Sequence, residues 1–158
     1  MIRKVISGGQ TGVDRAGLDA ALQAGIPIGG SCPKGRRAED GTIPDKYSLI
    51  ELDSPESYYR TEKNVIDSDG TLIINKGLIS EGTKLTLDFT VQYGKPSLVV
   101  QLDATEVVEP VRVVRWIKGQ YINTLNVAGP RESKCPGGIY QEALEYFVAV
   151  LNELKVTD

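Results

Sequence analysis

Short apolar runs alternate with amphipathic stretches along the chain. We interpret six of these runs as strands: Lys4–Ser7, Pro27–Gly30, Leu49–Leu52, Thr71–Asn75, Ser97–Leu102 and Thr124–Ala128. Most of them are apolar at consecutive positions, which is typical of parallel strands that are covered on both faces. The pattern therefore predicts a mostly parallel sheet of about six strands.

The stretches between these runs predict five helices: Asp14–Ala24, Tyr58–Asp67, Thr83–Tyr93, Val108–Lys118 and Tyr140–Leu154. Apolar residues recur at helical spacing most clearly in the last of them. Strands that alternate with helices are typical of an α/β fold with right-handed crossovers. We therefore expect a doubly wound sheet with helices on both faces.

The segment from Thr83 to Tyr93 gives a conflicting signal. Its apolar residues alternate strictly, as in a half-buried strand: Leu85, Leu87, Phe89, Val91 and Tyr93. However, the segment lies between two apolar strands, and a parallel pair needs a crossover of about a dozen residues. Gly94 and Pro96, which follow it, are helix stop signals. We predict a helix, which leaves the alternation without an explanation.

The composition narrows the class of protein. A chain of 158 residues is long enough for one well-packed domain, so we interpret residues 1–158 as a single domain. A net charge of −3 and an aromatic content of 6% argue against a nucleic-acid partner. The chain has no histidine, which excludes histidine acid–base catalysis and zinc sites that need imidazole.

The sequence shows no targeting signal. No apolar run approaches the roughly 18 residues of a membrane span, and no signal peptide precedes the first strand. Cys32 and Cys135 do not make a disulfide framework. Both precede proline just past predicted strands, so they either meet each other or a metal near the site, or are ordinary reduced thiols. We expect a cytoplasmic protein with no membrane partner.

The turn Gly8-Gly9-Gln10-Thr11-Gly12 carries the clearest chemical signal. Its glycines let the backbone approach a ligand, and the helix that follows directs free N–H groups at the turn. Such an arrangement binds phosphate. Val13-Asp14 stand where a Walker A loop needs Lys-Ser/Thr, and the carboxylate of the dinucleotide fingerprint is missing. We therefore expect a different kind of phosphate site with Arg15 beside it, or else a tight turn without a ligand.

Two further glycine-bearing turns follow predicted strands. In Ser80-Glu81-Gly82-Thr83, Ser80 either caps the next helix or contacts a ligand together with Gly82 and Thr83. In the segment Gly129–Ser133, Arg131 suits a bidentate phosphate contact and Ser133 suits a hydrogen bond. Ligands of parallel sheets bind outside the carboxyl ends of the strands, so the three turns together predict a phosphate-binding cleft there.

Residues 31–47 form a connection too long to be a simple link, and loops of this length are usually functional or mobile. Lys34, Arg36 and Arg37 concentrate positive charge in it. We interpret them either as a lid that steers anions into the cleft or as a solvated charged loop.

Four separated motifs resemble the family of "putative molybdenum carrier" proteins, and the resemblance covers nearly the whole chain. The motifs are Ser7–Arg15, Cys32–Gly41, Arg60-Thr61-Glu62 with Asn64-Val65 and Asp67-Ser68-Asp69, and Asn126–Ser133. The resemblance implies a Rossmann-like fold related to the DprA-like and lysine-decarboxylase-like (LOG) proteins. It also implies a small phosphorylated ligand, such as a nucleotide or molybdenum cofactor, and by analogy a homodimer.

One departure separates the chain from the LOG enzymes that cleave nucleoside monophosphates. Those enzymes carry the motif Pro-Gly-Gly-x-Gly-Thr-x-x-Glu, whose glutamate is catalytic. Here the matching segment is Gly82-Thr83-Lys84-Leu85-Thr86, with Thr86 in the place of the glutamate. The resemblance therefore does not extend to phosphoribohydrolase activity.

These observations leave three hypotheses. The first is a binding protein for a phosphorylated heterocycle, either a nucleotide derivative or the pterin phosphate of molybdenum cofactor. The second is a hydrolase or transferase that acts on a nucleotide-linked substrate. The third is a structural or interaction protein whose glycine turns are only turns. Acids or bases for an enzyme would come from the carboxylates near the cleft: Asp14, Glu81 and Glu132 as first candidates, then Glu39 and Asp40.

Overall fold

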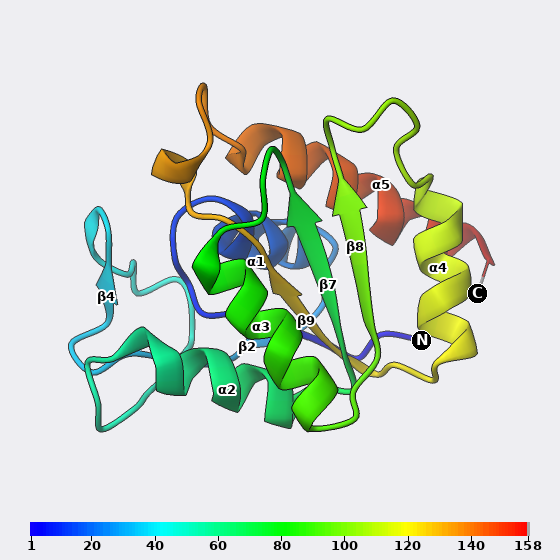
Figure 1. Cartoon of the computed structure of the whole chain (residues 1–158). Helices are drawn as coiled ribbons and strands as arrows, with labels where there is room; N and C mark the ends of the chain where they lie inside the picture. The colour runs from blue at the N-terminus through cyan, green and yellow to red at the C-terminus, as the bar shows by residue number, and fades with distance from the viewer. Residues whose placement is uncertain (158) are drawn as a thin grey trace.

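Five parallel strands form the central sheet, in the order β2-β1-β9-β7-β8. A computed structural model describes residues 1–157 of the chain (Figure 1). The strands are β1 (Lys4–Ile6), β2 (Ile28–Gly29), β7 (Gly70–Asn75), β8 (Ser97–Gln101) and β9 (Thr124–Ala128). All residues of β7 are buried, because this strand has a neighbour on each side and helices over both faces.

Helices cover both faces of this sheet. One face carries α1 (Val13–Gln23), α4 (Pro110–Gly119) and α5 (Tyr140–Thr157), and the other carries α2 (Ser57–Asp67) and α3 (Glu81–Gln92), as Figure 1 shows. The main core lies between the first three helices and the sheet. The predicted doubly wound α/β class is therefore confirmed, and all five predicted helices are present within a few residues of the expected ends.

The central sheet has one strand fewer than the six apolar runs suggested. The run Leu49–Leu52 contributes β6 (Ile50–Glu51), which pairs in parallel with β3 (Ser31–Cys32) in a separate two-stranded sheet. Both residues of β6 are exposed, so this strand does not suit a sheet that is buried on both faces. The break between β2 and β3 falls at Gly30, whose φ of +124° ends the first sheet's pairing.

The structure explains the alternating pattern of the segment 83–93, which is a helix as predicted. The side of α3 that faces the protein is formed by Phe89 and three threonines, at helical spacing: Thr83, Thr86 and Thr90. Val91, one of the alternating apolar residues, is 82% exposed. The alternation was misleading because threonines, counted as polar, occupy buried positions on this helix.

The long connection after β3 packs against the first half of α1, where it contacts Arg15, Leu18 and Asp19. We call residues 33–49 the hairpin segment, because β4 (Arg37–Ala38) and β5 (Gly41–Thr42) pair antiparallel at its tip. A small second core forms beneath it from Leu18, Cys32, Ile43 and Tyr47. The hairpin segment is therefore anchored by apolar packing of its own. Among the described residues, no helix is both long and apolar enough to cross a membrane.

Candidate functional site

A cavity of about 460 Å³ lies at the carboxyl ends of β1, β7 and β9, between the sheet and helices α2 and α3. Several of the residues predicted for the cleft line it: Gly8, Gln10, Asp14, Ser80, Glu81, Gly82, Thr83, Gly129 and Arg131. The three glycine-bearing turns therefore contribute to a single cavity. Its volume falls in the range of about 300–1,000 Å³ that is usual for small-molecule sites.

The first turn does not present free amides to this cavity. The Gln10 N–H donates to Asp14 Oδ2 (3.2 Å), and the Thr11 N–H donates to Gln10 Oε1 (3.0 Å). The Gly9 N–H donates to Ser7 Oγ (3.3 Å). The expectation that these amides hold a phosphate needs correction, because side chains of the same turn already accept their hydrogen bonds. The Asp14 carboxylate occupies the place expected for the ligand's anion.

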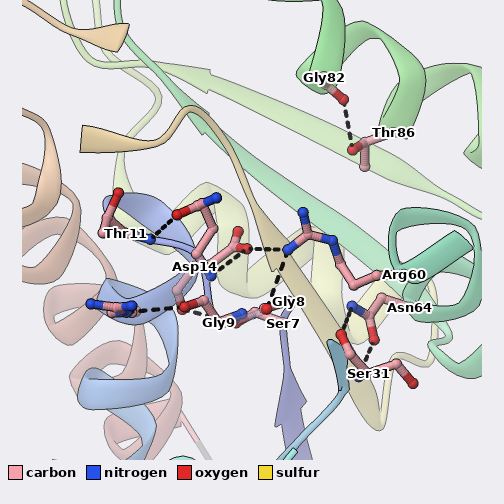
Figure 2. Close-up of polar contacts among 12 residues, drawn as sticks. Ser7, Gly8, Gly9, Thr11, Asp14, Ser31, Arg60, Asn64, Gly82 and Thr86 are labelled. Carbon is pink, nitrogen blue, oxygen red and sulfur yellow. Dashed lines mark hydrogen bonds and ion pairs between the residues drawn. The ribbon is translucent and has the colours of Figure 1, made fainter. Parts of the chain in front are cut away.

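Asp14 and Arg60 form a buried ion pair at the wall of the cavity (Figure 2). Arg60 Nη1 lies 3.6 Å from Asp14 Oδ2 and donates to the Gly8 carbonyl (3.2 Å). Both side chains are about nine-tenths buried, with exposures of 12% for Arg60 and 11% for Asp14. Burial raises the pKa of Asp14 to about 6, although the Arg60 charge and the backbone N–H groups of the turn oppose this shift.

Arg60 keeps a donor for a ligand, because its Nη2 donates to no described residue. Its Nε is one of two buried side-chain polar atoms in residues 1–157 that lack a hydrogen-bond partner, and it has almost no accessible surface. In Figure 2 the Arg60 guanidinium lies between the glycine turn and helix α3, which carries Gly82 and Thr86. An arginine with unused donors at the wall of a cavity is suited to bind an anion.

The start of α3 forms the opposite wall. Ser80 caps this helix, because its Oγ accepts the Thr83 N–H (3.3 Å). The N–H groups of Glu81 and Gly82 have no acceptor within the described chain, as is usual in the first turn of a helix. Thr86 Oγ1 also lines this wall and donates to the Gly82 carbonyl (3.2 Å) one turn earlier in the helix.

Several predicted residues lie outside the cavity. Gly9 and Gly12 pack against other segments, and Arg15 forms a bidentate ion pair with Asp40 (2.6 and 2.8 Å). The Arg36 guanidinium donates to carbonyl groups of the hairpin segment. Lys34 and Arg37 are exposed on the same segment and do not line the cavity. The cations predicted to steer a ligand therefore mainly shape the hairpin segment or face solvent.

The candidate acids have different roles. Glu132 accepts the N–H groups of Ile139 (2.6 Å) and Tyr140 (2.8 Å), so it caps α5 and does not line the cavity. Glu81 lines the cavity but is exposed. Asp14 is the buried carboxylic acid of the cavity wall.

Glu39 lies at the edge of the site, on the hairpin segment. It accepts hydrogen bonds from the Thr11 hydroxyl and from the Ser133 N–H and hydroxyl, and it lies 3.3 Å from Arg131 Nε. Partial burial would raise its pKa, but the hydrogen bonds from Ser133 and Thr11 outweigh burial and hold the pKa below its usual value. Thr11, Arg131 and Ser133 thus surround an anion, and that anion is part of the chain.

The two cysteines do not come together. Cys32 belongs to the small core under the hairpin segment, and Cys135 belongs to the main core. Burial raises the pKa of both thiols. Within residues 1–157, no group of three or more aspartate, glutamate or cysteine side chains is placed to hold a metal ion.

Residues 5–151 match the family model described as the circularly permutated YpsA SLOG family. The chain belongs to this family. It is also similar to a solved structure, "putative molybdenum carrier protein" from Syntrophus aciditrophicus SB, with 45% sequence identity, 95% of each chain covered and a TM-score of 0.86. None of the curated proteins matches the chain. The resemblance drawn from the four motifs is therefore confirmed.

In this member of the circularly permutated YpsA family, sequence reasoning missed several cavity residues: Ser57, Arg60, Thr61, Asn64, Asn126 and Lys134. Arg60, Asn64 and Asn126 lie in motifs that carried the family resemblance, but their residue types alone gave no role. Asn64 holds β3 to α2, because its Oδ1 accepts the Ser31 N–H (2.8 Å) and its Nδ2 donates to the Ser31 carbonyl (3.1 Å). Its role at this edge of the cavity is thus partly structural.

Proposed function

We propose that the protein binds a phosphorylated heterocycle in this cavity, either a nucleotide derivative or the pterin phosphate of molybdenum cofactor. The observation that carries the proposal is Arg60, whose guanidinium lies at the cavity wall and whose Nη2 donates to no described residue. The N–H groups of Glu81 and Gly82 and the positive end of the α3 dipole face the same cavity. A phosphate between these two walls would receive donors from both.

We assign the protein a carrier role, in which the ligand is held without being transformed. Two observations support this role. The similar structure from Syntrophus aciditrophicus is named a "putative molybdenum carrier protein", and in the sequence motif that resembles the LOG enzymes Thr86 stands in the place of the catalytic glutamate. Arg131 and Lys134 also line the cavity and add positive charge for an anionic ligand.

A thermal-shift screen with nucleotides and a pterin phosphate tests this proposal. A ligand at a hundred times its dissociation constant stabilises the folded state by about 2.7 kcal/mol, roughly 5–10 °C in melting temperature for a domain of this size. We expect Arg60→Lys to weaken binding by about 30-fold, since lysine keeps the charge beside Asp14 but loses the fork of donors. Arg112→Gln, which removes an exposed arginine of α4 away from the cavity, is the control. The absence of any shift of the wild-type protein across the panel would overturn the proposal.

Asp14 favours a second candidate function, hydrolysis or group transfer on a nucleotide-linked substrate. A buried carboxyl with a pKa of about 6 at the cavity wall is suited to exchange protons near neutral pH. On this hypothesis Asp14→Asn abolishes turnover of a nucleotide panel but retains binding, as measured by chromatography of the products. Wild-type protein that binds a nucleotide and releases no product contradicts the enzyme hypothesis.

A further inference from the structure

The Glu39 carboxylate is bound as a free anion would be. Its Oε1 accepts from the Thr11 hydroxyl and the Ser133 N–H (3.1 Å), and its Oε2 accepts from the Ser133 hydroxyl and faces Arg131 Nε (3.3 Å). Oε1 therefore has two hydrogen-bond donors, and Oε2 has one donor and the positive charge of Arg131. The Glu39 side chain is only 21% exposed, although it belongs to the tip of the exposed hairpin segment. We call the three partner residues the Glu39 cage.

The Glu39 cage adjoins the ligand cavity. Arg131 belongs to both, and Gln10, the neighbour of Thr11, lines the cavity. The Arg131 side chain has no other ion pair or hydrogen bond among the described residues. If the Glu39 carboxylate moved away, the cage would keep a guanidinium, two hydroxyls and an amide directed at one point. This donor set is suited to a phosphate.

We propose that the Glu39 cage is a second phosphate subsite, and that Glu39 is a tethered carboxylate that fills it until the ligand's own anionic group displaces it. The protein would then select ligands that carry two anionic groups, one bound at Arg60 and α3 and the other in the cage. This inference rests on the proposed function for the Arg60 end of the ligand. The cage itself is defined by contacts that do not involve Arg60.

Tethering decides which anions can displace Glu39. A group attached to the same chain acts at an effective concentration on the order of millimolar, so dilute free phosphate competes poorly with it. A phosphate on a ligand already held in the adjoining cavity has a comparable advantage. The hairpin segment would remain attached when Glu39 leaves, because Asp40 still pairs with Arg15 and the small core still packs beneath it.

Titration of inorganic phosphate by calorimetry tests the proposal without the natural ligand. We expect Glu39→Ala to bind phosphate about tenfold more tightly than the wild type, since the competing carboxylate is gone. Asp40→Ala is the matched control, because it removes the neighbouring ion pair of the hairpin segment but leaves the cage filled. This variant should show no gain in phosphate affinity. Glu39→Gln, which keeps the size of the side chain, is a second variant in case alanine impairs folding, and it should show a smaller gain.

Double variants separate this proposal from the proposed function. Adding Arg131→Ala to Glu39→Ala should remove the gain in phosphate affinity, whereas adding Arg60→Lys should preserve it. A failure of the cavity to bind heterocycles would therefore leave this result unchanged. Unchanged or weaker phosphate binding by both Glu39 variants overturns the subsite, as does an equal gain in Asp40→Ala or a gain that survives the loss of Arg131.

Discussion

Gly12→Ala will lower the free energy of unfolding by about 4 kcal/mol, through backbone strain and overpacking together. Gly12 has φ +81° and ψ −129°, a conformation that residues with a Cβ rarely adopt. An added Cβ would lie 2.5 Å from the Pro130 carbonyl oxygen and 2.8 Å from the Glu132 nitrogen. Both are backbone atoms, so the loop after β9 must move as a whole.

Gly25→Ala is the matched control for Gly12→Ala. Gly25 also has a positive φ, +72°, but an added Cβ there would meet no atom within 4 Å. We expect a loss of only about 1–2 kcal/mol, from the left-handed conformation alone. Urea denaturation followed by circular dichroism measures both variants. Equal losses of unfolding free energy would show that the close approach of Gly12 to the loop after β9 does not contribute to the effect of the substitution.

Asp14→Asn will change how stability depends on pH. The pKa of Asp14 is raised from 3.8 to about 6 in the folded protein, so its stabilising contribution is complete below pH 3.8 and is lost as the pH rises through 6. The loss amounts to about 3 kcal/mol, at 1.36 kcal/mol per pKa unit. Asparagine keeps an acceptor for the Gln10 N–H but does not ionise. As the pH rises from 4 to 7, the wild type should therefore lose about 3 kcal/mol of unfolding free energy that the variant keeps.

Urea denaturation at several pH values measures this difference. Asp88→Asn, which removes an exposed carboxylate of α3, should follow the wild-type profile. Parallel stability profiles for Asp14→Asn and the wild type would contradict the raised pKa. They would also remove the basis for Asp14 as a proton donor or acceptor near neutral pH.

The secondary structure and the place of the candidate cavity could be predicted because they depend on local patterns. The consecutive apolar residues of β7 indicate a strand buried on both faces, and glycine turns at strand ends indicate a site at the carboxyl edge of the sheet. The failure at Leu49–Leu52 has the same origin. An apolar run of that length predicts a strand, but it does not show which sheet the strand joins.

The chemistry of the site could not be predicted in the same way. Arg60 stands among polar residues of α2, where a local reading gives a solvated helix face, and only the folded chain places it beside Asp14. Glu39 is a comparable case. Its residue type suggested an acid or base, whereas the fold uses it as an anion bound by Thr11 and Ser133. Interactions between residues so far apart in the chain leave no local pattern.

The separation of the protein into two cores has a practical consequence. Each core holds one of the two cysteines, Cys32 beneath the hairpin segment and Cys135 among the residues packed on the sheet. A thiol reagent reaches a buried sulfur only when the structure around it opens locally. Cys32 therefore reports opening of the hairpin segment and Cys135 reports opening of the main body, so labelling rates of the unaltered protein distinguish the two motions without any introduced probe.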